Sequence, residues 1–285
     1  MQLETTTCLI CGSGERVDYG EKNAVRFAKC THCGYVAAAP MPSAEELAEL
    51  YDSQHFYSSY HPEEAEDQTL FEQRQRQYVL DRDHCLEFAE GGRLLDYGCG
   101  NGQFLGVFPE TFQKHGYEFN RVTTDYLKEK GAFTVLDTEA EIRALPDGEL
   151  DVVTMRGVIE HLIDPLATLE LLSSKLRAGG VLYICATPNV DSPCALLYGT
   201  SWNQFTPPFH LHHFSPRTLA LAGARLGLAL IDCRFPYLGT PYESEGEDGD
   251  RFLADTGRSA EGAELAASPP FPGTMMSLVF RKRGR

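Results

Sequence analysis

Residues 93–105 read R-L-L-D-Y-G-C-G-N-G-Q-F-L and restrict the possible folds more than any other stretch of the chain. An apolar strand ends at Asp96, and a helical pattern begins after three glycines at alternate positions: Gly98, Gly100 and Gly102. A strand, a glycine turn and a helix form the first half of a doubly wound nucleotide-binding unit. Glycine allows a sharp turn and close approach of a ligand to the backbone amides, and the helix N-terminus adds partial positive charge there. The stretch therefore predicts an α/β fold with a ligand site at this turn.

The details of the turn narrow the choice of ligand. A dinucleotide-binding turn reads G-x-G-x-x-G, and its last position is Gln103 here. Asp96 precedes the turn, where its carboxylate can accept hydrogen bonds from an ammonium group. The string D-x-G-x-G-x-G resembles the first motif of class I S-adenosylmethionine (SAM)-dependent methyltransferases, in which the turn wraps the methionyl part of the cofactor. The resemblance implies four cofactor-binding residues: Asp96, Gly98, Gly100 and Gly102. A tight turn without a ligand is the alternative, but packing alone rarely needs three glycines in one βα turn.

Length and charge exclude several classes of protein. The chain of 285 residues is long enough for one large domain and a small module, and its hydrophobic content of 42% suits a globular core. It has no N-terminal apolar run and no stretch of 18 apolar residues. We therefore expect no signal peptide, no membrane span and a cytoplasmic location. The formal net charge of -16 argues against a nucleic-acid partner, because such proteins normally carry a basic stripe.

Four of the nine cysteines form two pairs, Cys8-x-x-Cys11 and Cys30-x-x-Cys33, separated by 18 residues. Each pair can lie on one knuckle turn and present two thiolates to a tetrahedral Zn²⁺. A closed set of four cysteines leaves no open coordination position, so we expect a structural zinc site. Four unrelated core cysteines are the alternative, which the paired spacing disfavours. Residues 1–40 are therefore predicted to form a zinc-ribbon-like module that depends on its metal for stability.

Residues 41–90 are predicted to form a helical linker that covers the pocket. Ser43 and Glu46 have the spacing of a capping box at the start of a helix, and a polar helix is expected over about 70–89. The stretch 55–61, H-F-Y-S-S-Y-H, is rich in aromatic residues. Aromatic side chains serve two uses, so this stretch either covers a pocket or docks the linker on the main domain.

The second strand of the main domain is expected at 113–118 and ends at Glu118, 20 residues after Gly98. At this spacing, an acidic residue of such a fold binds ribose hydroxyls. A carboxylate suits the task because it can accept two hydrogen bonds from a cis-diol. A surface carboxylate is the alternative. A third strand is expected at 132–136 and ends at Asp137, which the resemblance implies as the residue that contacts the adenine amino group.

The fourth strand is expected at 150–155 and leads to Arg156 at its carboxyl end, where ligands bind in open α/β sheets. We therefore place Arg156 among the cofactor-binding residues. The string E-H-x-x-D-P at 160–165 is shared with many small-molecule methyltransferases. The resemblance implies that His161 lies near the cofactor methyl group, where it can act as a general base. The alternative is a packed, hydrogen-bonded histidine that shapes the loop.

An apolar strand is expected at 181–186, and the later segment 201–214 holds the only tryptophan and three of the nine histidines. A connection this rich in aromatic and histidine side chains is typical of a substrate wall. The string P-x-H-L-x-x-F-S occupies this place in related methyltransferases, which supports His210 and His213 as pocket residues. With His161, they are the candidate catalytic residues. Metal binding by the segment is disfavoured, because no carboxylate completes a ligand pattern within it.

Two further strands are expected at 228–235 and 275–280. Between them, the acidic segment 239–273 has no pattern, and we expect a flexible loop there. In the resembled family, the sheet has seven strands and is parallel except for the last one. We therefore expect residues 91–285 to form a doubly wound, mostly parallel, Rossmann-like methyltransferase domain.

These features together resemble a group of bacterial small-molecule methyltransferases, some of which act on nucleotide-linked sugars and other secondary metabolites. The resemblance implies transfer of a methyl group from SAM to a small-molecule acceptor. The expected acceptor atom is an oxygen of a secondary metabolite or sugar derivative. The alternative is a methyltransferase-fold binding or scaffold protein with a structural zinc module and no turnover. A nicotinamide oxidoreductase is disfavoured by Gln103.

Overall fold

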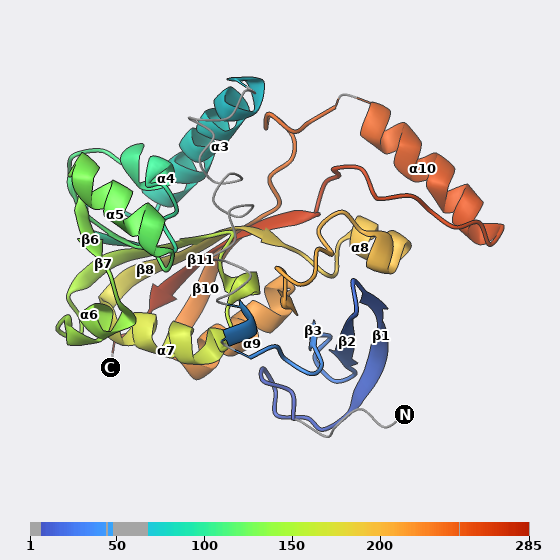
Figure 1. Cartoon of the computed structure of the whole chain (residues 1–285), viewed down its shortest axis with the longest axis horizontal. Coiled ribbons are helices and arrows are strands. Elements are labelled where there is room, and N and C mark those ends of the chain that lie inside the picture. The colour runs from blue at the N-terminus through green and yellow to red at the C-terminus, as the bar shows by residue number, and fades with distance from the viewer. Residues whose placement is uncertain (1–6, 44, 48–67, 245, 285) are drawn as a thin grey trace.

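The computed structural model describes residues 7–43, 45–47, 68–244 and 246–284. At its centre lies a seven-stranded sheet with the strand order β10-β11-β8-β7-β4-β5-β6 (Figure 1). β11 runs antiparallel to both neighbours, and the other adjacent pairs are parallel. This confirms the mostly parallel sheet predicted from the sequence. Its strands are β4 (Gly92–Tyr97), β5 (Phe112–Tyr117), β6 (Thr134–Leu136), β7 (Leu150–Arg156), β8 (Leu176–Pro188), β10 (Leu228–Arg234) and β11 (Met275–Lys282).

Helices cover both faces of this sheet. Figure 1 shows α3 and α4 on one face and α7 and α9 on the other. Successive residues of a strand point to opposite faces. Leu94 and Val152 accordingly pack with side chains of α3 and α4, and Leu95 and Val153 pack with those of α7 and α9. Because both faces are buried, the central strands are continuous apolar runs in the sequence. The helices are α3 (Gln68–Leu86), α4 (Gln103–Gly106), α5 (Arg121–Lys130), α6 (Glu139–Ala144), η1 (Ile159–His161), α7 (Pro165–Lys175), α8 (Pro193–Tyr198), η2 (Gly199–Ser201), α9 (Pro216–Arg225) and α10 (Glu247–Ala260).

A second, antiparallel sheet has the strand order β1-β2-β3-β9. The module expected at residues 1–40 provides three of these strands, but β9 comes from the histidine-rich segment, where His213 pairs with Val36. Arg225 of α9 also donates a hydrogen bond to the carbonyl oxygen of Ile10 at 2.8 Å. The module is thus completed and held by the main domain. The strands are β1 (Arg16–Lys22), β2 (Val25–Cys30), β3 (Val36–Ala38) and β9 (His212–His213).

The acidic segment 239–273 differs from the expected flexible loop, because it contains α10. Asp248 accepts a hydrogen bond from the Tyr237 hydroxyl at 2.7 Å, and Asp255 accepts one from the Tyr198 hydroxyl at 2.8 Å. Both carboxylates are buried. The composition of the segment hid this helix because the tyrosines that bind it lie outside the segment.

The linker is described only in part. The Ser43 amide donates to the Glu46 carboxylate at 2.7 Å, and the Glu46 amide donates to Ser43 Oγ at 3.2 Å, which confirms the capping box. The aromatic stretch 55–61 lies outside the described residues. Within the described ranges, no helix has both the length and the apolar character needed to cross a membrane.

Candidate active site

The glycine turn joins β4 to α4, and its three glycines have different roles. All have a positive φ, +78° at Gly98, +52° at Gly100 and +78° at Gly102, a backbone region that L side chains rarely adopt. A Cβ atom at Gly98 would lie 2.7 Å from Val158, and one at Gly102 would lie 2.6 Å from Phe133. Gly98 and Gly100 both line a cavity, and a Cβ atom at Gly100 would meet no atom within 4 Å outside its chain neighbours. Two glycines therefore permit tight packing, while Gly100 leaves room for a ligand.

Glu118 follows β5 and binds the glycine turn directly. Its Oε2 accepts a hydrogen bond from the Gly100 amide at 2.8 Å, and its Oε1 accepts one from the Asn120 amide at 2.9 Å. Burial raises the pKa of Glu118, and the two amides oppose this rise. The side chain lines the cavity, and a carboxylate oxygen can accept a second hydrogen bond. This arrangement suits the ribose-binding role predicted for Glu118.

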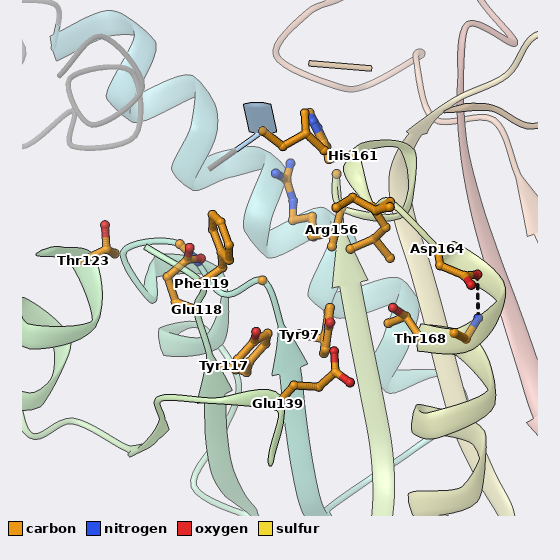
Figure 2. A pocket seen from close by; sticks show the side chains of 18 of the residues that line it. Tyr97, Tyr117, Glu118, Phe119, Thr123, Glu139, Arg156, His161, Asp164 and Thr168 are labelled. Carbon is orange, nitrogen blue, oxygen red and sulfur yellow. Dashed lines mark hydrogen bonds between the residues drawn. The ribbon is translucent and has the colours of Figure 1, made fainter. Parts of the chain in front are cut away.

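The cavity lies at the carboxyl ends of β4, β5 and β7 and has a volume of about 500 Å³ (Figure 2). Open α/β sheets bind their ligands at this edge. The glycine turn and Glu118 form one part of the wall, and the residues from His161 to Asp164 form another. Much of the remaining wall is apolar or aromatic and contains Tyr97, Tyr117, Phe119 and Val158.

Arg156, at the end of β7, lines the cavity and is held by α3. Its Nε donates to Asp81 Oδ2 at 2.8 Å, and its guanidinium carbon lies 4.5 Å from the ring centroid of Tyr78. Burial disfavours the charge of Arg156, but the nearby Asp81 outweighs this effect and raises the pKa. Arg156 therefore reaches the cavity as one half of an ion pair. Asp81 carries no local sequence signal for this role, because it is one of several charged residues on a polar helix.

The two other acidic residues predicted to bind the cofactor lie outside the cavity lining. Asp96 is buried and accepts a hydrogen bond from Thr154 Oγ1 at 2.6 Å, and burial raises its pKa to about 7. Asp137 forms an ion pair with Lys128 of α5. Each carboxylate is thus paired with a group of the protein, and the cofactor contacts expected of Asp96 and Asp137 stay a prediction.

His161 is the last residue of η1 and lines the cavity. Glu160 and His210 lie beside it. Its ring lies 4.7 Å from that of His210, and ligand atoms of Glu160, His161 and His210 lie within 4.8 Å of one another. Burial lowers the pKa of His161 to about 3 and raises that of Glu160 to about 8. The cluster can therefore transfer a proton or hold a divalent cation. The sequence analysis missed Glu160, although its place before His161 in the E-H string is a usable signal.

His213 is not among the residues that line the cavity, and its expected role as a pocket residue stays a prediction. Its ring is fully buried and stacks on Phe205, with 4.7 Å between centroids and 20° between planes. Among the described residues, neither of its ring nitrogens has a hydrogen-bond partner, and burial lowers its pKa well below the usual value. His213 thus packs between the main domain and the N-terminal module, whereas His210 reaches the cavity region through its contact with His161.

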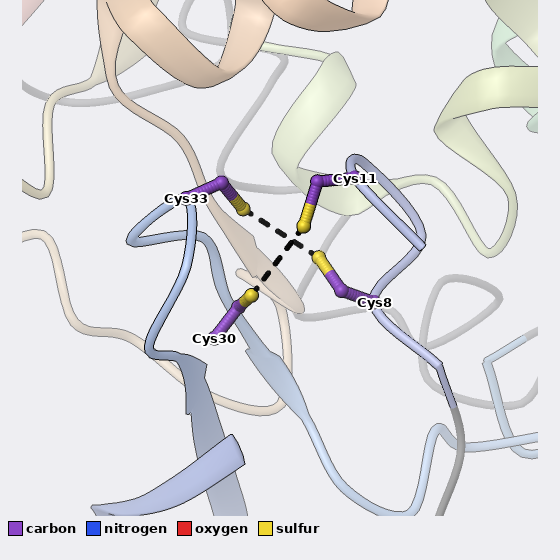
Figure 3. A group of neighbouring side chains, drawn as sticks. All are labelled: Cys8, Cys11, Cys30 and Cys33. Carbon is purple, nitrogen blue, oxygen red and sulfur yellow. Dashed lines mark hydrogen bonds between the residues drawn. The ribbon is translucent and has the colours of Figure 1, made fainter. Parts of the chain in front are cut away.

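The four paired cysteines turn their sulfur atoms toward a common centre (Figure 3). All four Sγ atoms lie within 4.8 Å of one another. The distance is 3.6 Å between Cys8 and Cys33 and 3.6 Å between Cys11 and Cys30. A Zn–S bond of about 2.3 Å places the sulfurs of a tetrahedral site about 3.8 Å apart. The donor set and its distances therefore fit a zinc ion.

Sequence comparisons point to one family. A family model described as a methyltransferase domain matches residues 70–232, more than half of the chain. The chain is 32% identical over 138 residues to a ubiquinone biosynthesis O-methyltransferase from Cereibacter sphaeroides, which is 44% of this chain and 54% of that protein. It is 29% identical over 173 residues to a protein of the same name from Xanthomonas euvesicatoria pv. vesicatoria, which is 55% of this chain and 69% of that protein. The match to the first relative thus spans about half of that relative's length.

Solved structures agree with the fold. A SAM-dependent methyltransferase from Archaeoglobus fulgidus superimposes with a TM-score of 0.53 at 22% identity, and the match covers 80% of this chain and 100% of that chain. A SAM-dependent methyltransferase from Thermotoga maritima, described as a possible histamine N-methyltransferase, gives a TM-score of 0.54 at 16% identity, covering 84% and 99%. At this level of identity, the likeness extends to the fold alone.

Proposed function

The chain belongs to the methyltransferase domain family, and from this premise we propose that it transfers the methyl group of SAM to an oxygen atom of a small-molecule acceptor. One observation carries the proposal: the same cavity is lined by the glycine turn with Glu118 and by His161. The first group suits a nucleoside cofactor, and the second is a candidate base beside it. The curated relatives are O-methyltransferases, which supports oxygen as the acceptor atom.

Gly100 and Glu118 are the residues that would hold the cofactor. The open space at Gly100 lets a ligand approach the backbone, and the Glu118 oxygens can accept hydrogen bonds from the two ribose hydroxyls. When bound, SAM supplies a methyl group on a sulfonium, which is a good electrophile. The chain itself must orient the acceptor and exclude water. The apolar side chains of Leu162 and Ile163 suit this task.

His161 is the proposed general base for the acceptor hydroxyl. Because burial lowers its pKa to about 3, the ring is neutral at pH 7 and has a nitrogen that can accept a proton. Glu160 lies beside it, and burial raises its pKa to about 8, so Glu160 is largely protonated at pH 7. Loss of the Glu160 proton as His161 gains one would stabilise the imidazolium. His161 therefore provides a proton acceptor, and the Glu160 carboxyl group lies close to the positive charge that His161 would gain.

The four clustered cysteines are proposed to hold one structural Zn²⁺. They form a closed set with sulfur spacings that suit tetrahedral coordination. The set lies in the N-terminal module, apart from the cavity lining. A closed site without an open position stabilises a fold and leaves no place for a substrate.

Two measurements test the proposed function. Calorimetry should show binding of S-adenosylhomocysteine and none of NAD. Release of S-adenosylhomocysteine from SAM should then occur with at least one member of a panel of phenols and sugar derivatives. Binding of NAD alone would refute the cofactor assignment. Cofactor binding without turnover across the panel would favour a scaffold protein, an alternative supported by the position of His213 outside the cavity lining.

A further inference from the structure

Two hydrogen bonds hold η1 against the histidine-rich segment, one on each side of His161. The Leu211 amide donates to the Glu160 carbonyl oxygen at 2.9 Å. The His212 ring pairs through Nε2 with the Leu162 carbonyl oxygen at 2.7 Å. His161 and Leu162 both line the cavity. The position of this part of the cavity wall is therefore set by the segment that forms β9.

The other ring nitrogen of His212 reaches the N-terminal module. His212 Nδ1 is hydrogen-bonded to the Tyr35 hydroxyl, and the two rings stack with 5.9 Å between centroids and 13° between planes. Tyr35 also closes the second cysteine knuckle, because its carbonyl oxygen accepts the Cys30 amide at 2.8 Å. Tyr35 and His212 are both buried. One continuous chain of contacts thus runs from Cys30 through Tyr35 and His212 to Leu162.

The chemistry of the partners fixes how His212 is protonated. The Leu162 carbonyl oxygen can only accept, so Nε2 of His212 must carry the hydrogen. In the neutral ring, Nδ1 is then an acceptor, and the Tyr35 hydroxyl donates to it. Burial lowers the pKa of His212 to about 4. The ring therefore stays neutral near pH 7, and the link has one defined direction.

We infer that Tyr35 and His212 are positioning residues that couple the second cysteine knuckle to the cavity wall at His161 and Leu162. The bond from His212 to Leu162 holds the wall in its ligand-binding position, and the bond from Tyr35 orients the His212 ring. A ligand that binds one conformation of the wall loses affinity when that conformation is less populated. The inference depends on the proposed function in one respect only, because one of its tests uses S-adenosylhomocysteine as the ligand.

Two substitutions of His212 separate its two bonds. In His212→Gln, the side-chain amide nitrogen can take the place of Nε2 and donate to Leu162. In His212→Asn, the shorter amide can take the place of Nδ1 and meet Tyr35, but it does not reach Leu162. The matched control is His32→Asn, because His32 belongs to the same cysteine knuckle and its side chain is exposed.

The first readout is calorimetry with S-adenosylhomocysteine at unchanged metal content. The loss of one net hydrogen bond predicts that His212→Asn binds the probe roughly two- to tenfold more weakly than the wild type. His212→Gln and His32→Asn should remain within about twofold of the wild type. Equal affinity of the Asn and Gln variants would overturn the inference, and so would loss of the metal from the Asn variant, because the effect would then be on the module as a whole.

The second readout needs no ligand. The His161 amide donates to the Val158 carbonyl oxygen within η1, so its hydrogen exchange reports opening of the turn. Exchange at this amide should be fastest in His212→Asn, which loses the bond to Leu162, and less strongly accelerated in Tyr35→Phe and His212→Gln, which keep that bond and lose the one from Tyr35. Slow exchange in both of the first two variants would refute the coupling. Because this readout uses the ligand-free protein, it tests the inference even if S-adenosylhomocysteine does not bind.

Discussion

Replacing Glu118 with glutamine tests the cofactor site with little change in shape. Each carboxylate oxygen of Glu118 accepts one backbone amide, from Gly100 and from Asn120. In Glu118→Gln, one oxygen becomes an NH₂ group, which would face a backbone donor and cannot accept its hydrogen bond. The variant also removes the charge that strengthens hydrogen bonds to a bound diol. The glycine turn and the ribose contact are therefore weakened together.

The size of the effect follows from these contacts. A hydrogen bond to a charged group contributes about 1.5–3 kcal/mol, which corresponds to roughly 10- to 150-fold weaker binding of S-adenosylhomocysteine. The stability of the ligand-free protein should change less. Burial raises the pKa of Glu118, so the neutral glutamine relieves a desolvation cost that offsets part of the lost amide contact. A net loss of about 1 kcal/mol would lower Tm by only about 2–4 °C.

Calorimetry and thermal unfolding of the same samples provide the test. The matched control is Glu139→Gln, because Glu139 also lines the cavity but is paired with Arg143. We expect the control to bind S-adenosylhomocysteine within a few-fold of the wild type. If Glu118→Gln binds the ligand as tightly as the wild type, the ribose role is wrong. A Tm loss much larger than expected would instead show that Glu118 mainly stabilises the glycine turn.

Three further predictions concern the metal, the base and the pH dependence. Metal analysis should find about one zinc per chain, and Cys30→Ser should lose it; full zinc occupancy in the variant would contradict the four-cysteine site. His161→Ala should bind S-adenosylhomocysteine nearly as well as the wild type while methyl transfer falls on the order of a hundredfold; unchanged turnover would remove His161 as the base. Burial raises the pKa of Asp96 to about 7 in the folded protein, so the folded state retains a proton that the unfolded state, with its ordinary aspartate pKa of about 4, releases. The urea midpoint of the ligand-free protein should therefore fall as pH rises from about 4 to 7, and it should fall less in Asp96→Asn; parallel curves for the two proteins would refute this reasoning.

Local sequence patterns predicted the parts of the site that local geometry controls. The glycine turn needs positive φ angles at fixed positions, and the structure has them at Gly98, Gly100 and Gly102. The distance along the chain from this turn to Glu118 is set by one βα unit and the next strand. Each cysteine pair likewise lies on one local turn, and the spacing within the pairs sufficed to predict that the four cysteines cluster.

Contacts between distant segments were not visible in the sequence. Arg156 was predicted to face the cofactor from its place at a strand end, but its ion pair with Asp81 depends on how α3 packs on the sheet. Asp137 was also predicted from its position at a strand end, and its ion pair with Lys128 of the preceding helix was not foreseen. A sequence position fixes which edge of the sheet a residue occupies. It does not fix which residue of opposite charge will form an ion pair with it.

The histidine-rich segment places neighbouring side chains in different surroundings. Its composition suggested a single substrate wall, yet the strand pairing of β9 with β3 divides its side chains between different surroundings. His212 links Tyr35 to Leu162, and the next residue, His213, stacks on Phe205 away from the cavity lining. Adjacent residues of a strand point to opposite sides, so His212 and His213 face different surroundings in β9. The pairing of β9 with β3 also joins the cysteine module to η1. A loss of order in the module should therefore change the position of His161, through His212, more than that of Glu118. Glu118 is held by the glycine turn instead.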